Sequence, residues 1–161
     1  MKKPSFGAVV AGAALGGIAV IAAVYLGVGQ SEPKTTVADA ADVKLVALGQ
    51  TVYKAECASC HGTRLEGQPN WRSRLPNGGL PAPPHDETGH TWHHPDQLLF
   101  ATTKYGGAKN APPGFVSGMP AFGEKLTERE IWATLAYIKS RWPAQLRQRQ
   151  ARINDRASQQ K

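Results

Sequence analysis

The stretch Cys57-Ala58-Ser59-Cys60-His61 decides how the rest of this chain is interpreted. Two thiols three positions apart can add across the two vinyl groups of a haem, and the histidine directly after them can bond the iron from one face. The C-x-x-C-H pattern therefore predicts one covalent haem c, attached through Cys57 and Cys60, with His61 as an iron ligand.

A haem iron bonded to histidine on one face is commonly held by methionine on the other. Apart from the initiator, the chain contains one methionine, Met119, in the tripeptide Gly118-Met119-Pro120. His61 and Met119 are therefore the predicted metal ligands, and Cys57, Cys60, His61 and Met119 together form the predicted cofactor site.

Other uses of the cysteine pair fit the sequence less well. Cys57 and Cys60 are the chain's two cysteines, so it cannot supply a four-cysteine zinc site. A thioredoxin-like redox pair would follow a strand, whereas here a helical pattern precedes the motif and glycine and proline residues follow it. A structural disulfide gives no reason for a histidine at position 61.

The first 30 residues predict a membrane anchor or a signal segment. Lys2 and Lys3 precede a run without charged residues from Phe6 to Gln30. This run exceeds the roughly 7–15 residues of a signal-peptide core and meets the roughly 18 needed to span a bilayer. Ala38-Asp39-Ala40 offers a cleavage site, but it lies well beyond the run. We expect an uncleaved anchor, with cleavage near Ala40 as the alternative.

Because the leader lysines stay cytoplasmic, the rest of the chain is expected to cross the bacterial inner membrane into the periplasm. A linker over residues 31–41 would then join the anchor or signal segment, 1–30, to one domain over 42–142. A basic tail over 143–161 completes the chain. Cleavage near Ala40 would instead give a soluble periplasmic protein.

The formal net charge of +7 arises mostly outside the central domain. After Pro143 the tail carries four arginines and one lysine against the single acid Asp155. Such a tail on an exported protein is typical of a solvated helix or a docking surface, and the absence of zinc-finger or RNP-like motifs argues against nucleic-acid binding. Leu146 and Ile153 predict a weakly amphipathic helix lying loosely on the domain.

Three helical stretches and no strand pattern predict an all-α domain with long loops rich in glycine and proline. The first runs from about 42 to 57, with Asp42 as its N-cap and Gly49 indicating a close helix crossing. The second begins at Pro95 and ends before Gly106. The third begins with the capping box Thr127-Glu128-Arg129-Glu130.

With CASCHG, the downstream Gly-Met-Pro and an aromatic-bearing terminal helix in this order, the chain resembles class I cytochromes c. It is most similar to the small bacterial forms that are membrane-attached or periplasmic, and the resemblance covers about Val43 to Trp142. It implies a cytochrome c fold wrapped around one haem, with thioethers from Cys57 and Cys60 and axial bonds from His61 and Met119.

The resemblance also implies two structural contacts. The first helix should cross the last near Gly49 and Tyr53, opposite Trp132, Ala136 or Tyr137. A backbone carbonyl of the segment Leu80-Pro81-Ala82-Pro83-Pro84 should accept a hydrogen bond from the His61 ring and so fix its orientation.

The segment from Pro84 to His94 departs from the family pattern because it contains most of the chain's histidines. They are His85, His90, His93 and His94. One interpretation is a copper or zinc site, or a pH-sensitive docking surface. The other is a loop at the haem edge that bonds a propionate or, through His93 or His94, caps the helix at Pro95. A bis-histidine haem, with one of these rings in place of Met119, also remains open.

Trp71, Arg72 and Arg74 form a second group in the loop that follows the motif. Arginine suits planar carboxylates, so these side chains are consistent with pairing to haem propionates. They are equally consistent with an exposed loop.

Filled axial positions would leave the iron no open site, so we expect a one-electron carrier rather than an enzyme, either free or as a subunit of an oxidoreductase complex. The resemblance implies a quinol-oxidising complex or dehydrogenase as donor and an oxidase or reductase as acceptor. Two alternatives are a haem enzyme or gas or redox sensor with a displaceable Met119, and a metal-handling protein that uses the histidine loop.

Overall fold

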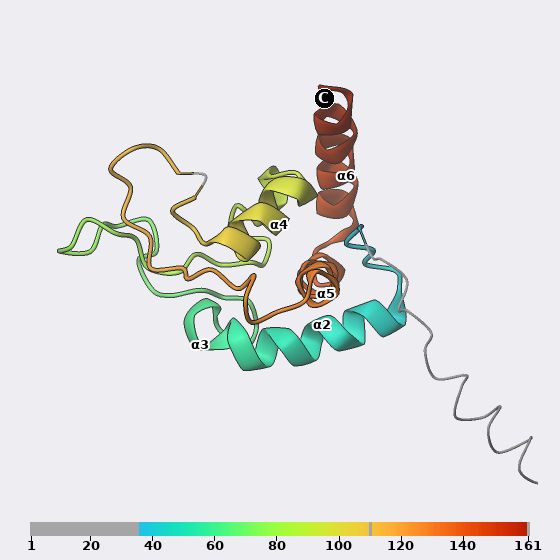
Figure 1. Ribbon diagram of the computed structural model, residues 1–161. Helices are drawn as coiled ribbons and strands as arrows, with labels where there is room; N and C mark the ends of the chain where they lie inside the picture. The colour runs from blue at the N-terminus through green and yellow to red at the C-terminus, as the bar shows by residue number, and fades with distance from the viewer. Residues whose placement is uncertain (1–35, 110, 161) are drawn as a thin grey trace, which may run out of the picture. The chain divides into compact units, whose positions relative to one another are not determined.

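The computed structural model describes residues 36–109 and 111–160, and these residues form helices and loops without a strand. The elements are α2 (Val43–Glu56), α3 (Ala58–His61), the short 3-10 helix η1 (Thr91–His93), α4 (Asp96–Tyr105), α5 (Glu128–Ser140) and α6 (Ala144–Gln159) (Figure 1). The predicted all-α class is confirmed. The leader over 1–30 lies outside the described residues. Among the described residues, no helix is long and apolar enough to cross a membrane.

Helix α2 begins at the predicted cap. The Asp42 carboxylate accepts hydrogen bonds of 3.0 Å from the backbone N–H groups of Lys44 and Leu45, which the first helical turn leaves without partners. The buried face of the helix carries Leu45, Gly49, Val52 and Tyr53. Its last residues therefore deliver the C-x-x-C-H turn directly from a helix anchored in the core.

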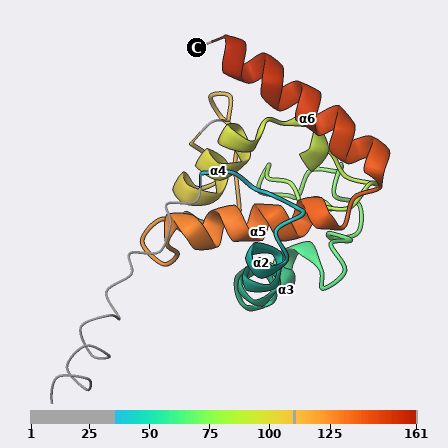
Figure 2. The same ribbon diagram turned by 90° about the vertical axis from the view of Figure 1, so that its right-hand side faces the viewer.

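Helices α2 and α5 cross each other. Figure 1 looks along α5 with α2 lying across the view, and Figure 2 shows the reverse arrangement. A Cβ atom on Gly49 would lie 1.9 Å from the carbonyl oxygen of Ala133. The predicted close crossing is therefore real, and only glycine allows the two backbones to approach this closely.

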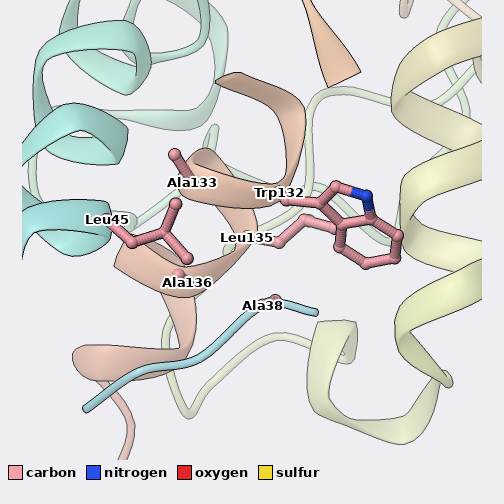
Figure 3. Close-up of a cluster of buried hydrophobic side chains, with 6 residues drawn as sticks. All are labelled: Ala38, Leu45, Trp132, Ala133, Leu135 and Ala136. Carbon is pink, nitrogen blue, oxygen red and sulfur yellow. The ribbon is translucent and has the colours of Figure 1, made fainter. Parts of the chain in front are cut away.

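Two groups of buried side chains fill the core around this crossing. The first contains Ala38, Leu45, Trp132, Ala133, Leu135 and Ala136 (Figure 3). The second contains Tyr53, Leu65, Tyr137, Ile138 and Trp142. In the second group the rings of Tyr53 and Tyr137 lie 5.4 Å apart, which is the aromatic contact that the family resemblance implies. Helix α5 contributes to both groups and is the centre of the domain.

The starts of α4 and α5 show one correction and one confirmation. Pro95 has an extended ψ of 151° and precedes α4 instead of forming its first turn. The first backbone N–H of α4, on Asp96, bonds Asn154 Oδ1 at 2.7 Å, so a cap from His93 or His94 was the wrong prediction. The capping box of α5 is present, with Thr127 and Glu130 each accepting from the other's backbone N–H.

The tail is helical, and it is held by specific bonds instead of lying loosely. Lys139 Nζ lies 2.6 Å from Asp96 Oδ2, and this buried ion pair joins α5 to α4. From α6, Gln150 Nε2 donates to Asp96 Oδ1 at 2.6 Å and Asn154 Nδ2 donates to Asp96 Oδ2 at 3.0 Å. Leu146 also packs against the second core group. One buried carboxylate therefore ties three helices together.

Replacement of Gly49 by alanine should destabilise the domain. In an open helix this exchange would stabilise by about 1 kcal/mol, but here the added methyl group overlaps the Ala133 carbonyl. Overpacking costs of about 1–3 kcal/mol or more should therefore appear in denaturant unfolding. Ala55→Gly, at an exposed position of α2, is the control and should cost only about 1 kcal/mol. A stabilised Gly49→Ala protein would contradict the crossing.

Replacement of Asp96 by alanine should cost about 3–5 kcal/mol, because the buried Lys139 ammonium would lose its carboxylate. Chemical denaturation monitored by circular dichroism would measure the loss. The control is Arg64→Gln, which removes an ion pair of 3.8 Å whose arginine side chain is 87% exposed. Because exposed pairs contribute little, this control should stay within about 1 kcal/mol of the wild type. Equal effects of the two variants would contradict the role of Asp96.

Candidate haem site

The C-x-x-C-H motif forms a single helical turn at the end of α2. Cys57 caps α2, and the backbone N–H groups of Cys60 and His61 bond the Cys57 carbonyl at 3.1 and 2.9 Å. Residues three apart on a helical turn lie on the same side, so the two thiols are neighbours. Both cysteines are free, Cys57 partly buried and Cys60 exposed.

The thiol chemistry separates this site from a redox CxxC pair. Burial and the neighbouring charges of Glu56 and Cys60 raise the pKa of the Cys57 thiol to about 11. Catalytic cysteines of disulfide oxidoreductases have lowered pKa values, because the thiolate is the nucleophile. Cys57 is therefore protonated near neutral pH, and the βαβ setting of a thioredoxin-like site is absent from the described residues.

The His61 ring is buried and oriented from one end. Its Nδ1 lies 2.8 Å from the Pro83 carbonyl oxygen, so Nδ1–H donates and Nε2 is the nitrogen left to bind a metal. Burial lowers the pKa of His61, and the hydrogen bond to Pro83 partly opposes that change. The resemblance placed the accepting carbonyl within residues 80–84, and the structure identifies it as that of Pro83.

The chain leaves the motif through a turn that requires glycine. Gly62 has a φ of +80°, a backbone conformation that residues other than glycine rarely adopt. Its carbonyl accepts a 2.9 Å bond from the Tyr53 hydroxyl, and the Gly67 N–H bonds the His61 carbonyl at 2.8 Å. These bonds fold the following loop back over the motif and bring Pro83 to His61.

Met119 lies in the loop between α4 and α5, apart from the C-x-x-C-H turn in the sequence. Its carbonyl accepts from the Gly107 N–H at 3.1 Å, and its own N–H donates to Ser117 Oγ at 3.1 Å. This loop meets the loop after the motif where a Cβ atom on Gly79 would lie 3.3 Å from the Val116 carbonyl oxygen. Figure 1 shows the two loops together, to the left of α5.

The four histidines of the 84–94 segment do not converge on one point. His85 stacks on His61, His90 stacks on Trp71, and His93 packs against Trp92. The rings of His90 and His94 touch edge to face, with centroids 5.4 Å apart. Within residues 36–109 and 111–160, no group of three or more His, Cys, Asp or Glu side chains could hold a metal ion.

The stack also bears on a bis-histidine haem. The centroids of the His61 and His85 rings are 4.0 Å apart and the rings are inclined by 22°. Two rings stacked face to face cannot bind one iron from opposite sides, so His85 is not the partner of His61 in such a haem. Burial and the neighbouring His61 and His90 lower the pKa of His85 well below its usual value, which keeps this ring neutral.

Trp71, Arg72 and Arg74 have partners of their own. The Arg72 guanidinium lies 4.0 Å from the centre of the Trp71 ring, and Arg74 Nη1 donates to the Gly78 carbonyl at 2.6 Å. Both arginines are exposed. These contacts and this exposure fit the interpretation of the segment as an exposed loop.

The donor set present fits a covalently bound haem c. Two neighbouring thiols, one buried imidazole with a free Nε2 and one thioether on an adjacent loop are the groups that such a haem uses. The indole N–H of Trp92 is buried without a hydrogen-bond partner among the described residues. Trp92 packs on the same core group as Cys57, and the carboxylates of a haem can accept a hydrogen bond from a donor of this kind.

Sequence reasoning missed two features of this region. It did not separate His85 from the other histidines, although Pro83-Pro84 directly before it holds the backbone that bonds His61. It also missed Asp96 as an anchor for three helices, because an acid in the first turn of a helix usually stays exposed.

Comparison with known proteins gives the class. The family model for cytochrome c matches residues 46–142, which is more than half of the chain. This chain belongs to the cytochrome c family, whose members carry haem c bound covalently through a C-x-x-C-H motif.

Three relatives resemble parts of the chain. The cbb3-type cytochrome c oxidase subunit FixP of Sinorhizobium medicae (strain WSM419) is 30% identical over 97 residues, covering 59% of this chain and 29% of the relative. The FixP subunit of Rhizobium meliloti (strain 1021) is 31% identical over 97 residues, which again cover 59% of this chain and 29% of the relative. Cytochrome c-555 of Prosthecochloris aestuarii is 49% identical over 39 residues, 20% of this chain and 39% of the relative. The chain thus spans less than a third of the FixP subunits, and no solved structure matches it.

Proposed function

We propose that this protein carries single electrons through one haem c in a respiratory or periplasmic electron-transport chain. The observation that carries the proposal is the C-x-x-C-H turn, in which two neighbouring free thiols precede a histidine that Pro83 orients for metal binding. Membership of the cytochrome c family supports it. When bound, the haem supplies an iron that changes between the ferrous and ferric states without breaking a bond.

Each predicted site residue has a distinct part in this proposal. Cys57 and Cys60 hold the haem through thioether bonds, and His61 Nε2 bonds the iron while Nδ1 stays hydrogen bonded to Pro83. Met119 supplies a thioether sulfur from the facing loop and favours the ferrous state. With His61 and Met119 both engaged, no site for a substrate remains, which favours a carrier over a haem enzyme or sensor.

The proposed partners are other redox proteins. A quinol-oxidising complex or a dehydrogenase would donate the electron, and an oxidase or reductase would accept it. The similarity to oxidase subunits named FixP favours work beside or within a cbb3-type oxidase complex. The structure offers no converging set of histidines for a separate metal-handling role among its described residues.

We also propose that the leader stays attached and anchors the domain at the inner membrane, on its periplasmic side. Cleavage after Ala40 would remove Ala38, which is only 2% exposed and belongs to the first core group together with Leu45 and Trp132 (Figure 3). Removal of this side chain would open the core beside α2 and α5. The A-x-A sequence is therefore better explained as the first part of the folded domain than as a processing site.

Replacement of Met119 by alanine should abolish the sulfur-to-iron absorption band of the oxidised protein and lower its reduction potential, because the thioether stabilises ferrous iron. Visible and near-infrared spectra with a redox titration would measure both effects. Val116→Ala, in the same loop and 43% exposed, is the control and should change neither. An unchanged Met119→Ala spectrum would remove Met119 from the ligand set, whereas rapid carbon monoxide binding by the reduced wild type would favour a sensor or enzyme.

Retention of the leader predicts that the haem protein fractionates with membranes and keeps its first 30 residues. The mass of the detergent-extracted holoprotein would show this directly. A chain in which a cleavable secretion signal replaces residues 1–30, with processing at position 31, should release a folded red domain into the periplasm. A mature wild-type N-terminus at Ala41 would contradict the proposal.

A further inference from the structure

His85 lies against the proposed iron ligand. Its ring covers one face of the His61 ring, with centroids 4.0 Å apart and an inclination of 22°. The other three histidines of the segment make their ring contacts with Trp71, Trp92 and each other. His85 is therefore the one histidine of this segment whose recorded ring contact is with a proposed ligand.

The position of His85 is fixed by bonds on all sides. Its Nδ1 lies 2.7 Å from the hydroxyl oxygen of Thr91, a buried residue. The backbone N–H of His85 donates to the Leu65 carbonyl, and the backbone carbonyl of His85 accepts from the Trp142 indole N–H, both at 2.7 Å. The edge of the ring meets Tyr53 at a centroid distance of 6.4 Å. A ring held in this way cannot turn with its neighbour and can impose an orientation on it.

The two contacts of His61 restrict different motions. The bond from Nδ1 to Pro83 fixes where one edge of the ring points, but it still allows the ring to tilt about that bond. Stacking against His85 removes the tilt, because a rotated His61 ring would lose face contact or collide with the fixed neighbour. Together the two contacts define the plane of the imidazole as well as its direction.

We propose that His85 is a positioning residue that fixes the ring plane of His61 by face-to-face stacking and is itself held by Thr91. This inference rests on the proposed role of His61 as an iron ligand. The ring plane of an imidazole bound to iron determines which d orbitals it overlaps, so a change in that plane would alter the magnetic axes of the oxidised iron. His85 acts on the iron through His61 and makes no bond to it.

The test compares His85→Phe, His85→Leu and His85→Ala in the haem-loaded full chain. Phenylalanine keeps a flat ring for stacking, leucine keeps apolar volume without a flat face, and alanine removes both. Electron paramagnetic resonance and the paramagnetically shifted haem methyl signals in proton NMR report the imidazole plane, and neither depends on electron-transfer activity. His93→Phe is the matched control, because His93 is exposed and its ring packs against Trp92 instead of His61.

We expect His85→Leu and His85→Ala to change the order of the haem methyl shifts and to broaden the resonance of the oxidised iron. His93→Phe should retain the wild-type pattern. His85→Phe should depart from it less than His85→Leu, because phenylalanine keeps the flat ring and loses only the bond to Thr91. Thr91→Val should change the methyl shifts in the same direction as His85→Leu, but by less. The His85 ring would still be present in this variant, but it would lose its hydrogen bond to the Thr91 hydroxyl. If His85→Ala does not fold, the comparison of Leu with Phe decides the question.

A wild-type pattern in His85→Leu, or the same altered pattern in Phe and Leu, would overturn the positioning role. The failure of the proposed function looks different. In that case the wild type would lack covalent haem, or His61→Ala would leave the axial ligand spectrum unchanged. A covalent His61-ligated haem combined with an unaffected His85→Leu variant would refute the stacking inference alone.

Discussion

The close contact between the backbones of α2 and α5 at Gly49 and Ala133 is the constraint on which the rest of the domain depends. It allows α5 to contribute to both core groups, and it fixes the direction of α2. Because Cys57 caps α2 and His61 follows one turn later, the motif inherits its position from this crossing. A wider separation of the helices would move the proposed haem ligand relative to the loop that holds Pro83.

Local patterns in the sequence predicted most of the helical framework. Asp42, Gly49 and the box begun by Thr127 each act through neighbours a few positions away or through a glycine that admits a second backbone, and each lies where expected. The start of α4 differed because its first N–H bonds Asn154, which is 58 positions distant. A pairing over that distance leaves no local signal, so the sequence suggested a neighbouring histidine instead.

The candidate site likewise contains some residues that a local sequence pattern predicts and others that depend on distant contacts. Cys57, Cys60 and His61 form a contiguous motif that predicts haem attachment by itself, whereas the prediction of Met119 as a ligand depends on how few methionines the chain contains. The choice of Pro83 among several prolines, and of His85 among four histidines, depended on how the loop returns from Gly62. Composition could indicate that the histidines matter but could not assign a different contact to each.

The burial of Ala38 has a consequence for the reach of the domain. Because this residue belongs to the core, only residues 31–37 would lie between the folded domain and the proposed anchor. A fully extended chain covers about 3.3–3.6 Å per residue, so these positions allow a tether of at most about 25 Å. A carrier tethered this closely would meet its donors and acceptors by diffusing within the plane of the membrane. The high local concentration of such partners at the membrane can compensate for weak binding affinity.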